Sequence, residues 1–236
     1  MHLGDFGYWV PDPATRKYLF RVEKRLGELD MRLLFVDGNH EDHDRLIAVP
    51  LDPASGLRPI SDHIAHLPRG HRWSWQDKDG RSWTWLALGG AISVDRHHSK
   101  IRKSWWPAEA LTEADVASAT NDGVVDVLVS HDAPARVPVP TIDRKLGWPT
   151  DVMVDADSHR QLLLTACERL RPRQLWHGHY HCRYDSQLYL GTVEARPDWD
   201  GVCHVHGLDC DYSSRDANLI LAAADGTPLR PPQSTT

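Results

Sequence analysis

The chain has 236 residues, of which 41% are hydrophobic and 25% are charged, a composition typical of a single globular domain. No stretch approaches the about 18 consecutive apolar residues of a membrane span, and the first residues lack the basic and apolar regions of a signal peptide. The net charge of −6 argues against wholesale binding of nucleic acid or of an anionic membrane. The four cysteines form no CxxC pair, so we expect reduced thiols in a cytoplasmic protein.

The first 36 residues predict a βαβ unit. Residues 2–3 are typical of the end of a strand, residues 14–29 carry a helical stripe of apolar side chains, and residues 32–36 form a short buried strand. Both strands end in turns with polar side chains. In open α/β sheets, ligands bind at such carboxyl ends of strands.

Four tryptophans lie in a predicted hairpin formed by residues 72–77 and 81–86. A three-residue loop with Gly80 in the left-handed conformation pairs Trp73 with Trp85 and places all four rings on one face. A two-residue loop would put the tryptophan pairs on opposite faces, so we favour the longer loop. The rings could stack nucleobases. Burial between two sheets is favoured, because a hairpin needs one buried face.

The remaining elements are assigned from periodicity and turn signals. A capping box from Thr112 to Asp115 predicts the start of a short helix. Residues 89–107 and 135–150 are expected to be loops. Further predicted elements are a strand at 124–129, a helix at 155–170, and strands at 173–177, 181–186, 188–194, 202–208 and 218–223. We expect residues 1–227 to form one domain and residues 228–236 a flexible tail.

Four short motifs with polar side chains lie at or near the ends of predicted strands. They are Gly-Asp-Phe-Gly at 4–7, Gly-Asn-His-Glu at 38–41, Ser-His-Asp at 130–132 and Gly-His-Tyr-His at 178–181. Each motif alone means little, because Gly-Asp is common in turns and a single histidine is usually a surface or core residue. A His-x-His pair suits a metal, yet His204 and His206 form a second such pair. All four motifs together, in this order, strongly indicate a functional site.

The order of these motifs resembles that of the calcineurin-like metallophosphoesterase superfamily. The family pattern is Asp-x-His, Gly-Asp, Gly-Asn-His-(Asp/Glu), a single His and Gly-His-x-His, and its last four parts span residues 4–181 here. Residues 88–95 and 104–107 look like a bacterial and phage branch of this superfamily. The resemblance implies an α+β or α/β fold, namely an αββα sandwich of two mixed β-sheets flanked by helices. It also implies a hydrolase that acts on phosphomonoesters or phosphodiesters.

Carried over residue by residue, the resemblance implies a centre of two divalent metal ions, Mn, Fe or Zn. Asp5 would bridge both ions. One ion would be completed by Asn39, His131 and His179, and the other would be served by His181. Mixed nitrogen and oxygen ligands suit these metals better than Mg²⁺ or Ca²⁺. Two such ions, roughly 3.5–4 Å apart, can hold a hydroxide that attacks phosphorus in line with the leaving group.

The resemblance also implies roles beside the metal ions. His40 would donate a proton to the leaving oxygen or stabilise its charge. Glu41 and Asp44 are close enough in sequence to orient His40. Candidates for substrate contacts lie in the two long loops and are Arg96, Arg102 and Arg144 for the phosphate and Trp105 as a wall of the site.

The Asp-x-His motif that ends the first strand in the family has no counterpart, because only three residues precede Gly4. We therefore expect the first strand to be absent and the second ion, left with Asp5 and His181, to bind poorly. One hypothesis is that the in-frame DNA upstream of Met1 encodes an apolar strand ending in Asp-x-His. A stop codon just upstream, without such a strand, would refute it.

The sequence is compatible with several substrates and functions. Protein Ser/Thr phosphatases of this superfamily carry Gly-Asp-x-x-Asp-Arg-Gly, and residues 8–10 here do not match its second half, which argues against a protein phosphatase. A small phosphorylated substrate, a nucleotide or a similar metabolite, is preferred over a nucleic acid because of the net charge of −6. A nuclease of the same superfamily would need a basic track, for which residues 96–103 are the local candidate, and the net charge argues weakly against it. Another alternative is a non-catalytic interaction module that keeps the fold and one ion. Two tightly bound ions per chain would exclude it.

A structural zinc site near the C-terminus is not favoured. The spacing of Cys203, His204, His206 and Cys210 matches no common structural zinc pattern.

Overall fold

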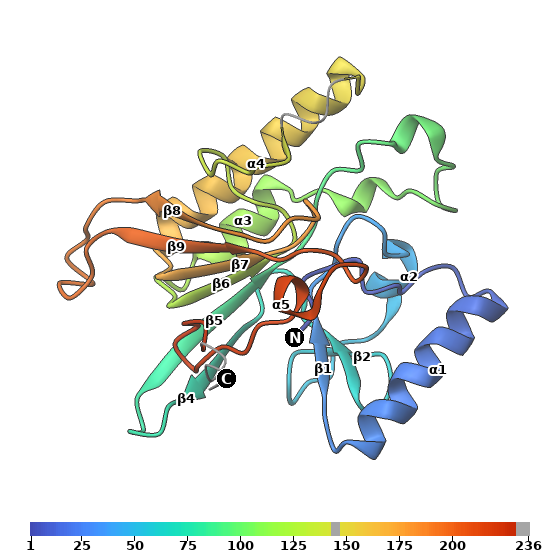
Figure 1. Ribbon diagram of the computed structural model, residues 1–236, viewed down its shortest axis with the longest axis horizontal. Coiled ribbons are helices and arrows are strands. Elements are labelled where there is room, and N and C mark those ends of the chain that lie inside the picture. The colour runs from blue at the N-terminus through green and yellow to red at the C-terminus, as the bar shows by residue number, and fades with distance from the viewer. Residues whose placement is uncertain (143–146, 230–236) are drawn as a thin grey trace, which may run out of the picture.

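The computed structural model describes residues 1–142 and 147–229 as two mixed β-sheets with surrounding helices (Figure 1). The smaller sheet has the strand order β1 (Leu33–Phe35), β3 (Ile64–His66) and β2 (Arg58–Pro59). The larger sheet has the order β4 (Arg72–Gln76), β5 (Ser82–Leu88), β6 (Val127–Ser130), β7 (Gln174–His177), β9 (Val202–Gly207) and β8 (Tyr184–Tyr189). In the larger sheet, neighbouring strands from β5 to β9 are parallel, and an antiparallel pair lies at each edge. The smaller sheet pairs β1 with β3 in parallel and β2 with β3 antiparallel.

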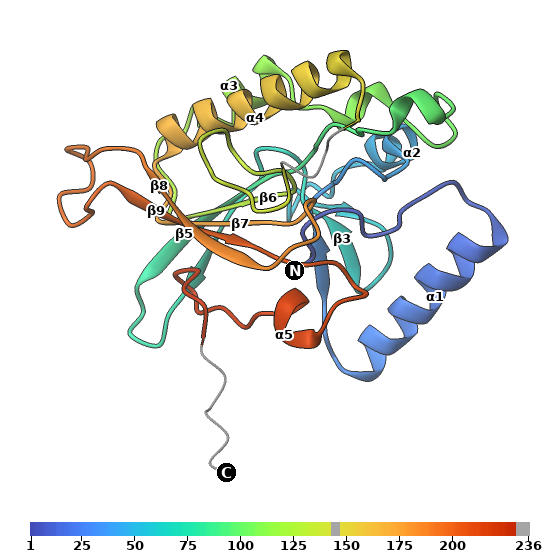
Figure 2. The ribbon, with the colours of Figure 1, turned by 45° about the horizontal axis from the view of Figure 1, so that its top comes forward.

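The helices cover the sheets from opposite sides. They are α1 (Pro13–Glu28), α2 (His43–Ala48), α3 (Glu113–Thr120), α4 (Thr150–Leu170) and α5 (Arg215–Asn218), with short 3-10 helices η1 (Arg96–His98) and η2 (Pro107–Glu109). Figure 2 shows α3 and α4 across one face of the larger sheet and α5 on its other side. None of the helices in the described ranges is long and apolar enough to cross a membrane.

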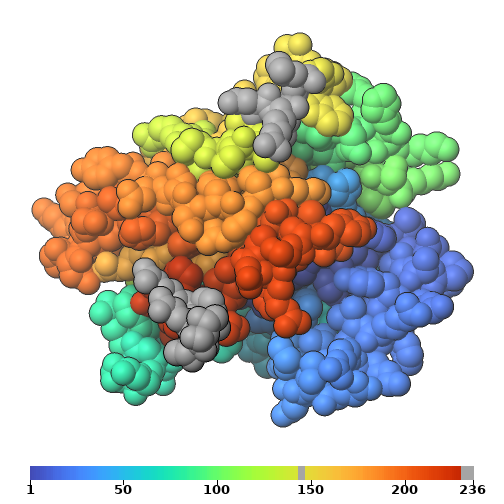
Figure 3. All heavy atoms as spheres, in the orientation of Figure 1, coloured from blue at the N-terminus to red at the C-terminus, as the bar shows by residue number. Residues whose placement is uncertain are grey.

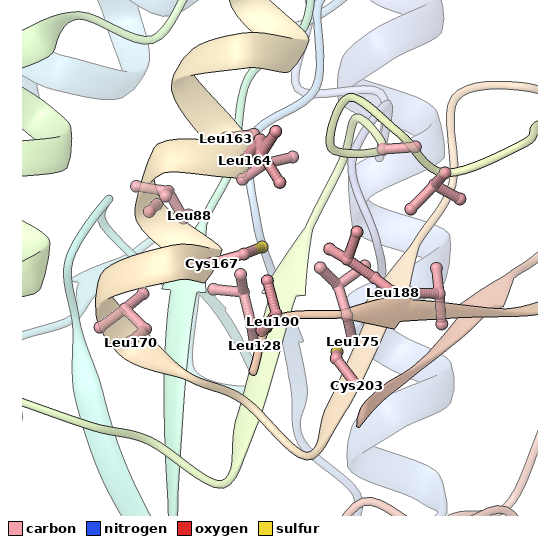
Figure 4. Close-up of a cluster of buried hydrophobic side chains, with 14 of the residues drawn as sticks. Leu88, Leu128, Leu163, Leu164, Cys167, Leu170, Leu175, Leu188, Leu190 and Cys203 are labelled. Carbon is pink, nitrogen blue, oxygen red and sulfur yellow. The ribbon is translucent and has the colours of Figure 1, made fainter. Parts of the chain in front are cut away.

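Three clusters of buried side chains give the order of the layers. In the first, side chains of α4 such as Leu163 and Cys167 share a cluster with Leu128 of the larger sheet (Figure 4). The second cluster lies between the sheets and joins Val36 to Trp176. The third packs the apolar side of α1 against Phe35. The fold is therefore mixed α/β with two mixed sheets and is compatible with an α/β sandwich.

Strand β6 illustrates how the sequence specifies this layering. Successive side chains of a strand point to opposite faces. Leu128 accordingly belongs to the cluster beneath α4, while Val127 and Val129 belong to the cluster between the sheets. Because both faces are covered, the strand needs an uninterrupted apolar run, as expected for a buried parallel strand.

The predicted tryptophan hairpin is confirmed in its register. Trp73 pairs with Trp85 and Trp75 with Trp83, and Gly80 has a φ of 79° in the three-residue loop. The burial of the rings is uneven, however. Trp85 is 7% exposed and packs between the sheets, whereas Trp75 lies near the tip of the hairpin and is 46% exposed.

The capping box at the start of α3 is confirmed, and helix α4 begins five residues before the predicted start. The predicted strands at 181–186 and 188–194 are wrong as two strands, since the one strand β8 pairs along its whole length with β9. The short elements α2, β2 and β3 were not predicted. Each is six residues or fewer, too short to show a hydrophobic period.

The strand predicted at 218–223 is also wrong, because this segment joins neither sheet and instead packs Ile220 onto the cluster between them. The backbone carbonyls of Ala224 and Gly226 accept hydrogen bonds from the indole nitrogens of Trp85 and Trp176. In the space-filling view the C-terminal segment spreads over this face of the molecule (Figure 3). Pro228 bridges to Ala222 at the start of the predicted tail, and residues 230–236 lie outside the described ranges.

Candidate metal centre

The four motif turns meet where parallel strands of the two sheets end. Residues 1–3 run parallel to β1, since the His2 amide donates to Leu34 O at 2.7 Å and the Val36 amide donates to His2 O at 3.1 Å. The Gly-Asp turn therefore lies beside the Gly-Asn-His-Glu turn that follows β1. The other two turns follow β6 and β7, which are parallel neighbours in the larger sheet.

The side chains of these turns converge on one point. One ligand atom from each of Asp5, His131 and His179 lies within 4.8 Å of the other two. His131 Nε2 is 3.2 Å from Asp5 Oδ2 and 3.2 Å from Asn39 Oδ1. All four residues predicted to hold the first ion are thus brought together from segments up to 174 residues apart.

The tautomer of His131 is set by its other ring nitrogen. His131 Nδ1 lies 2.5 Å from the carbonyl oxygen of Leu3, and a carbonyl can only accept, so Nδ1 carries the hydrogen. The lone pair of Nε2 in the neutral ring then faces the oxygens of Asp5 and Asn39. Hydrogen bonds of this kind orient histidine ligands in metal sites.

The motif glycines allow the turns to approach each other closely. A Cβ on Gly4 would lie 2.1 Å from His131 Nδ1, and a Cβ on Gly38 would lie 2.2 Å from Asp5 Oδ1. The backbone is also strained here, because Asp5 (φ 54°), His179 (φ 67°) and His181 (φ 48°) are left-handed although none is a glycine. Such residues cost of order 1–3 kcal/mol each and gather at functional sites.

The amide group of Asn39 is held by two residues that no motif indicated. Asn39 Nδ2 donates to Ser93 Oγ at 3.1 Å, and Ser93 Oγ donates to Glu109 Oε2 at 2.6 Å. Glu109 is buried and also accepts from the Ser93 amide at 2.7 Å. With its nitrogen engaged by Ser93, Asn39 must direct Oδ1 toward His131 and the centre of the cluster.

Glu41 has a different role from the predicted orientation of His40. Its buried carboxylate accepts hydrogen bonds from the backbone amides of Gly38 at 2.6 Å, Asp5 at 3.3 Å and Gly7 at 3.3 Å. Burial and the neighbouring Asp5 charge raise the pKa of Glu41 to about 8. Glu41 therefore joins the first two motif turns through their backbone.

His40 lies at the solvent-exposed edge of the cluster, and its backbone amide donates to Asp5 Oδ1 at 3.0 Å. Asp44 is exposed, and its Oδ2 lies 3.6 Å from Nε of Arg102. Within the described ranges, no hydrogen bond joins the His40 ring to Glu41 or Asp44. The structure thus gives neither carboxylate the orienting contact that the sequence suggested.

The electrostatics of the cluster centre on Asp5. Burial opposes its ionisation, but His131 holds the pKa of the carboxyl well below its usual range. Burial would likewise lower the pKa of His131, yet the charge and hydrogen bond of Asp5 raise it to about 9. Both shifts favour a carboxylate on Asp5 and an imidazolium on His131 when no cation is bound. A metal ion would take over the positive charge of the imidazolium.

A second layer of polar contacts lies behind the histidines. Asp132 Oδ2 is 2.8 Å from His159 Nδ1, and Asp132 Oδ1 accepts from the Tyr180 hydroxyl at 2.6 Å. Asp132 follows His131 and Tyr180 follows His179, so this carboxylate ties the two histidine turns to α4. The sequence did not indicate His159, since a single histidine within an amphipathic helix looks like any partly buried residue.

The other predicted site residues are not gathered into this cluster. His181 is exposed and lies outside the group of three ligand atoms. Arg96 is engaged by two carboxylates of α4, Asp151 at 3.3 Å and Asp155 at 2.6 Å. Arg102 is 75% exposed in its side chain. Trp105 lines a cavity near the cluster, and Arg144 lies outside the described residues.

Comparison with known proteins adds no relative. No protein-family model matches the chain, and no curated protein matches it. A functional conclusion therefore rests on the four motif turns, on the resemblance they carry and on the geometry that brings Asp5, Asn39, His131 and His179 together.

Proposed function

We propose that this chain is a metal-dependent phosphoesterase of the calcineurin-like metallophosphoesterase superfamily, with an αββα sandwich fold. It would hydrolyse phosphomonoesters or phosphodiesters of a small substrate. The observation that carries the proposal is the convergence of Asp5, Asn39, His131 and His179. These four side chains come from four separate turns, and they are the set that the resemblance assigns to one ion.

The residues present suit a divalent transition metal. The set offers one carboxylate, one amide oxygen and two imidazoles, which favours Mn²⁺, Fe or Zn²⁺ over Ca²⁺. The donors are also oriented from outside, His131 by the Leu3 carbonyl and Asn39 by Ser93. Such outer contacts are typical of metal ligands, and their loss weakens metal binding roughly 10- to 100-fold.

The catalytic roles of the chain follow from this arrangement. When bound, the metal supplies a Lewis acid for the phosphoryl oxygens and lowers the pKa of the attacking water. Asp5 uses Oδ1 to accept from the His40 amide, which leaves Oδ2 for the metal and holds His40 at the edge of the site. The exposed His40 ring donates a proton to the leaving oxygen. Glu41 keeps Asp5 and Gly38 in place through their backbone amides.

A second ion, held by Asp5 and His181, is proposed from the resemblance. His181 follows His179 by two residues, but it is exposed and outside the ligand group. We therefore expect one ion to bind tightly to this chain and the second to bind weakly. Counting bound Mn²⁺ by equilibrium dialysis over a range of concentrations separates the two sites.

Hydrolysis of chromogenic esters tests the proposal. The protein is stripped with a chelator, supplied with Mn²⁺ and assayed with 4-nitrophenyl phosphate and bis(4-nitrophenyl) phosphate. We expect hydrolysis that requires the metal and disappears in His131→Ala, while His204→Ala, a histidine of the exposed face of β9, retains it. Equal activity in His131→Ala and the unaltered protein would refute the site. Tight Mn²⁺ binding with no hydrolysis of any ester would favour the non-catalytic interaction module.

A further inference from the structure

A cavity of about 330 Å³ lies between the segment that follows β5 and the first half of α4. This volume is within the range of about 300–1,000 Å³ that is typical of small-molecule sites. Its apolar wall includes Ile92, Leu111 and Leu162, together with the indole of Trp105. Two of its polar residues, Glu109 and His159, are almost fully buried.

His159 presents one nitrogen that needs a partner. Its ring is 2% exposed and its Nδ1 is paired with Asp132 at 2.8 Å. Its Nε2 is buried and has no hydrogen-bond partner within residues 1–142 and 147–229. A buried polar atom left unpaired is costly and rare. In the tautomer whose Nδ1 donates to Asp132, Nε2 carries the lone pair, so the partner that it lacks is a donor.

Hydrogen bonds link two residues in the wall of the cavity to the proposed metal centre. Glu109, in its wall, is linked through Ser93 to the amide of Asn39. His159, also in its wall, is linked to Asp132, the residue that follows His131. Two walls of the cavity are thus each one residue removed from a candidate ligand, Asn39 on one side and His131 on the other.

We propose that the cavity binds the base of a nucleotide substrate, with the ring against Trp105 and a ring or exocyclic N–H donated to His159 Nε2. The position of the phosphate in this proposal rests on the proposed phosphoesterase function. An alkyl group would fill the apolar space but leave Nε2 unpaired. A planar nitrogen heterocycle satisfies both the indole and the acceptor.

Two pairs of esters that differ in the base test this proposal. Adenosine 5′-monophosphate is compared with ribose 5-phosphate, and thymidine 5′-(4-nitrophenyl phosphate) with methyl 4-nitrophenyl phosphate, each with Mn²⁺. We expect a higher kcat/KM for the member that carries a base. Trp105→Ala should reduce this preference roughly 5- to 100-fold, the range found when a stacking aromatic is removed. Leu162→Trp, which fills the cavity without altering a polar group, should reduce it as well.

Trp75→Ala is the matched control, since Trp75 is an exposed indole on the hairpin that contacts neither the cavity nor the metal cluster. It should keep the preference of the unaltered protein. Hydrolysis of all four esters with no preference for a base, or with a preference that survives both Trp105→Ala and Leu162→Trp, would overturn the proposal and leave the phosphoesterase function intact.

A binding measurement separates the two proposals when no ester is hydrolysed. Adenosine, which lacks a phosphate, is titrated into the protein and followed by ligand-observed NMR. Binding that is weakened at least about 5-fold in Trp105→Ala and Leu162→Trp, but not in Trp75→Ala, supports the base site even if the phosphoesterase proposal fails. Absence of adenosine binding at millimolar concentration, together with no preference for a base in hydrolysis, refutes the base site.

Discussion

Two His-x-His pairs with the same spacing have different surroundings in this molecule. His179 and His181 follow strand β7, and the ring of His179 lies 5.0 Å from that of His131. His204 and His206 lie inside strand β9, where His206 is buried and His204 is exposed. Only the first pair contributes to the cluster of candidate ligands.

The difference comes from where each pair lies relative to the end of a strand. Both ring nitrogens of His206 are engaged, Nδ1 by Asp185 at 2.7 Å and Nε2 by Gln174 at 2.8 Å, and its ring stacks on Trp176. No lone pair is left for a metal. His179 lies in a left-handed turn beyond its strand, where the loops of neighbouring strands also end. The spacing of two histidines therefore indicates a metal site only together with its place in the sheet.

The largest expected effect is the loss of Mn²⁺ binding, which should distinguish the candidate metal centre from the second histidine pair. His131→Ala removes a ligand whose Nε2 faces both Asp5 and Asn39, so Mn²⁺ affinity should fall by at least about 100-fold and hydrolysis should be lost. Isothermal titration with Mn²⁺ measures the affinity. His204→Ala should bind Mn²⁺ as the unaltered protein does, and a large loss in both variants would contradict the assignment.

Replacement of His40 should reduce catalysis without weakening metal binding. His40→Asn removes the ring but keeps the backbone amide that donates to Asp5, so the cluster should retain its shape. We expect kcat to fall roughly 10²- to 10⁴-fold, as for the loss of a general acid. The affinity for Mn²⁺ should change by less than about 3-fold. A variant with normal kcat would exclude His40 as the proton donor.

Ser93 tests how the amide of Asn39 is held. Ser93→Ala frees Nδ2 of Asn39, so Mn²⁺ affinity should fall roughly 10- to 100-fold. Ser93→Thr keeps a hydroxyl between Asn39 and Glu109 and should restore most of the affinity. Thermal denaturation of both variants without metal shows whether the fold is retained. Equal Mn²⁺ affinity in Ser93→Ala and the unaltered protein would contradict this role.

The pH dependence of metal binding follows from His131. Its pKa is raised to about 9 by Asp5, so the ring is protonated at neutral pH until a metal displaces the proton. Because one proton is released, Mn²⁺ affinity should rise about 10-fold per pH unit from pH 6 to 8 and level off near the pKa. Titrations in buffers of different ionisation enthalpy count the released protons, and no release at pH 7 would contradict the protonated state.

The smallest effect on metal binding is expected at the second histidine pair. His206→Ala removes two hydrogen bonds and a stacked ring, so the free energy of unfolding should fall by about 1–3 kcal/mol. Its Mn²⁺ affinity should not change. Chemical denaturation measures the first quantity and titration the second, and a loss of metal binding in this folded variant would reverse the roles of the two pairs.

The sequence allowed the four motif turns to be predicted because each carries a short local signature after an apolar run. The register of the hairpin could also be predicted, since the position of Gly80 limits the length of the loop. The sequence could not indicate Ser93, Glu109 or His159, because their roles arise from hydrogen bonds between segments 16 to 54 residues apart.

The errors in the fold have a related cause. Residues 218–223 carry apolar side chains that look like a strand, but Ile220 packs onto the cluster between the sheets. The backbone just after this segment, at Ala224 and Gly226, accepts hydrogen bonds from two tryptophans. An apolar run indicates burial and does not by itself specify pairing. Closeness in sequence suggests that Glu41 orients His40, but its carboxyl group instead accepts hydrogen bonds from the backbone amides of Asp5 and Gly7.

Anomalous diffraction from crystals grown with Mn²⁺ tests the metal centre most directly. We expect the strongest anomalous peak among Asp5 Oδ2, Asn39 Oδ1, His131 Nε2 and a ring nitrogen of His179, at ligand distances of about 2.0–2.3 Å. No peak at this position at millimolar Mn²⁺, or a stronger peak beside His204 and His206, would contradict it.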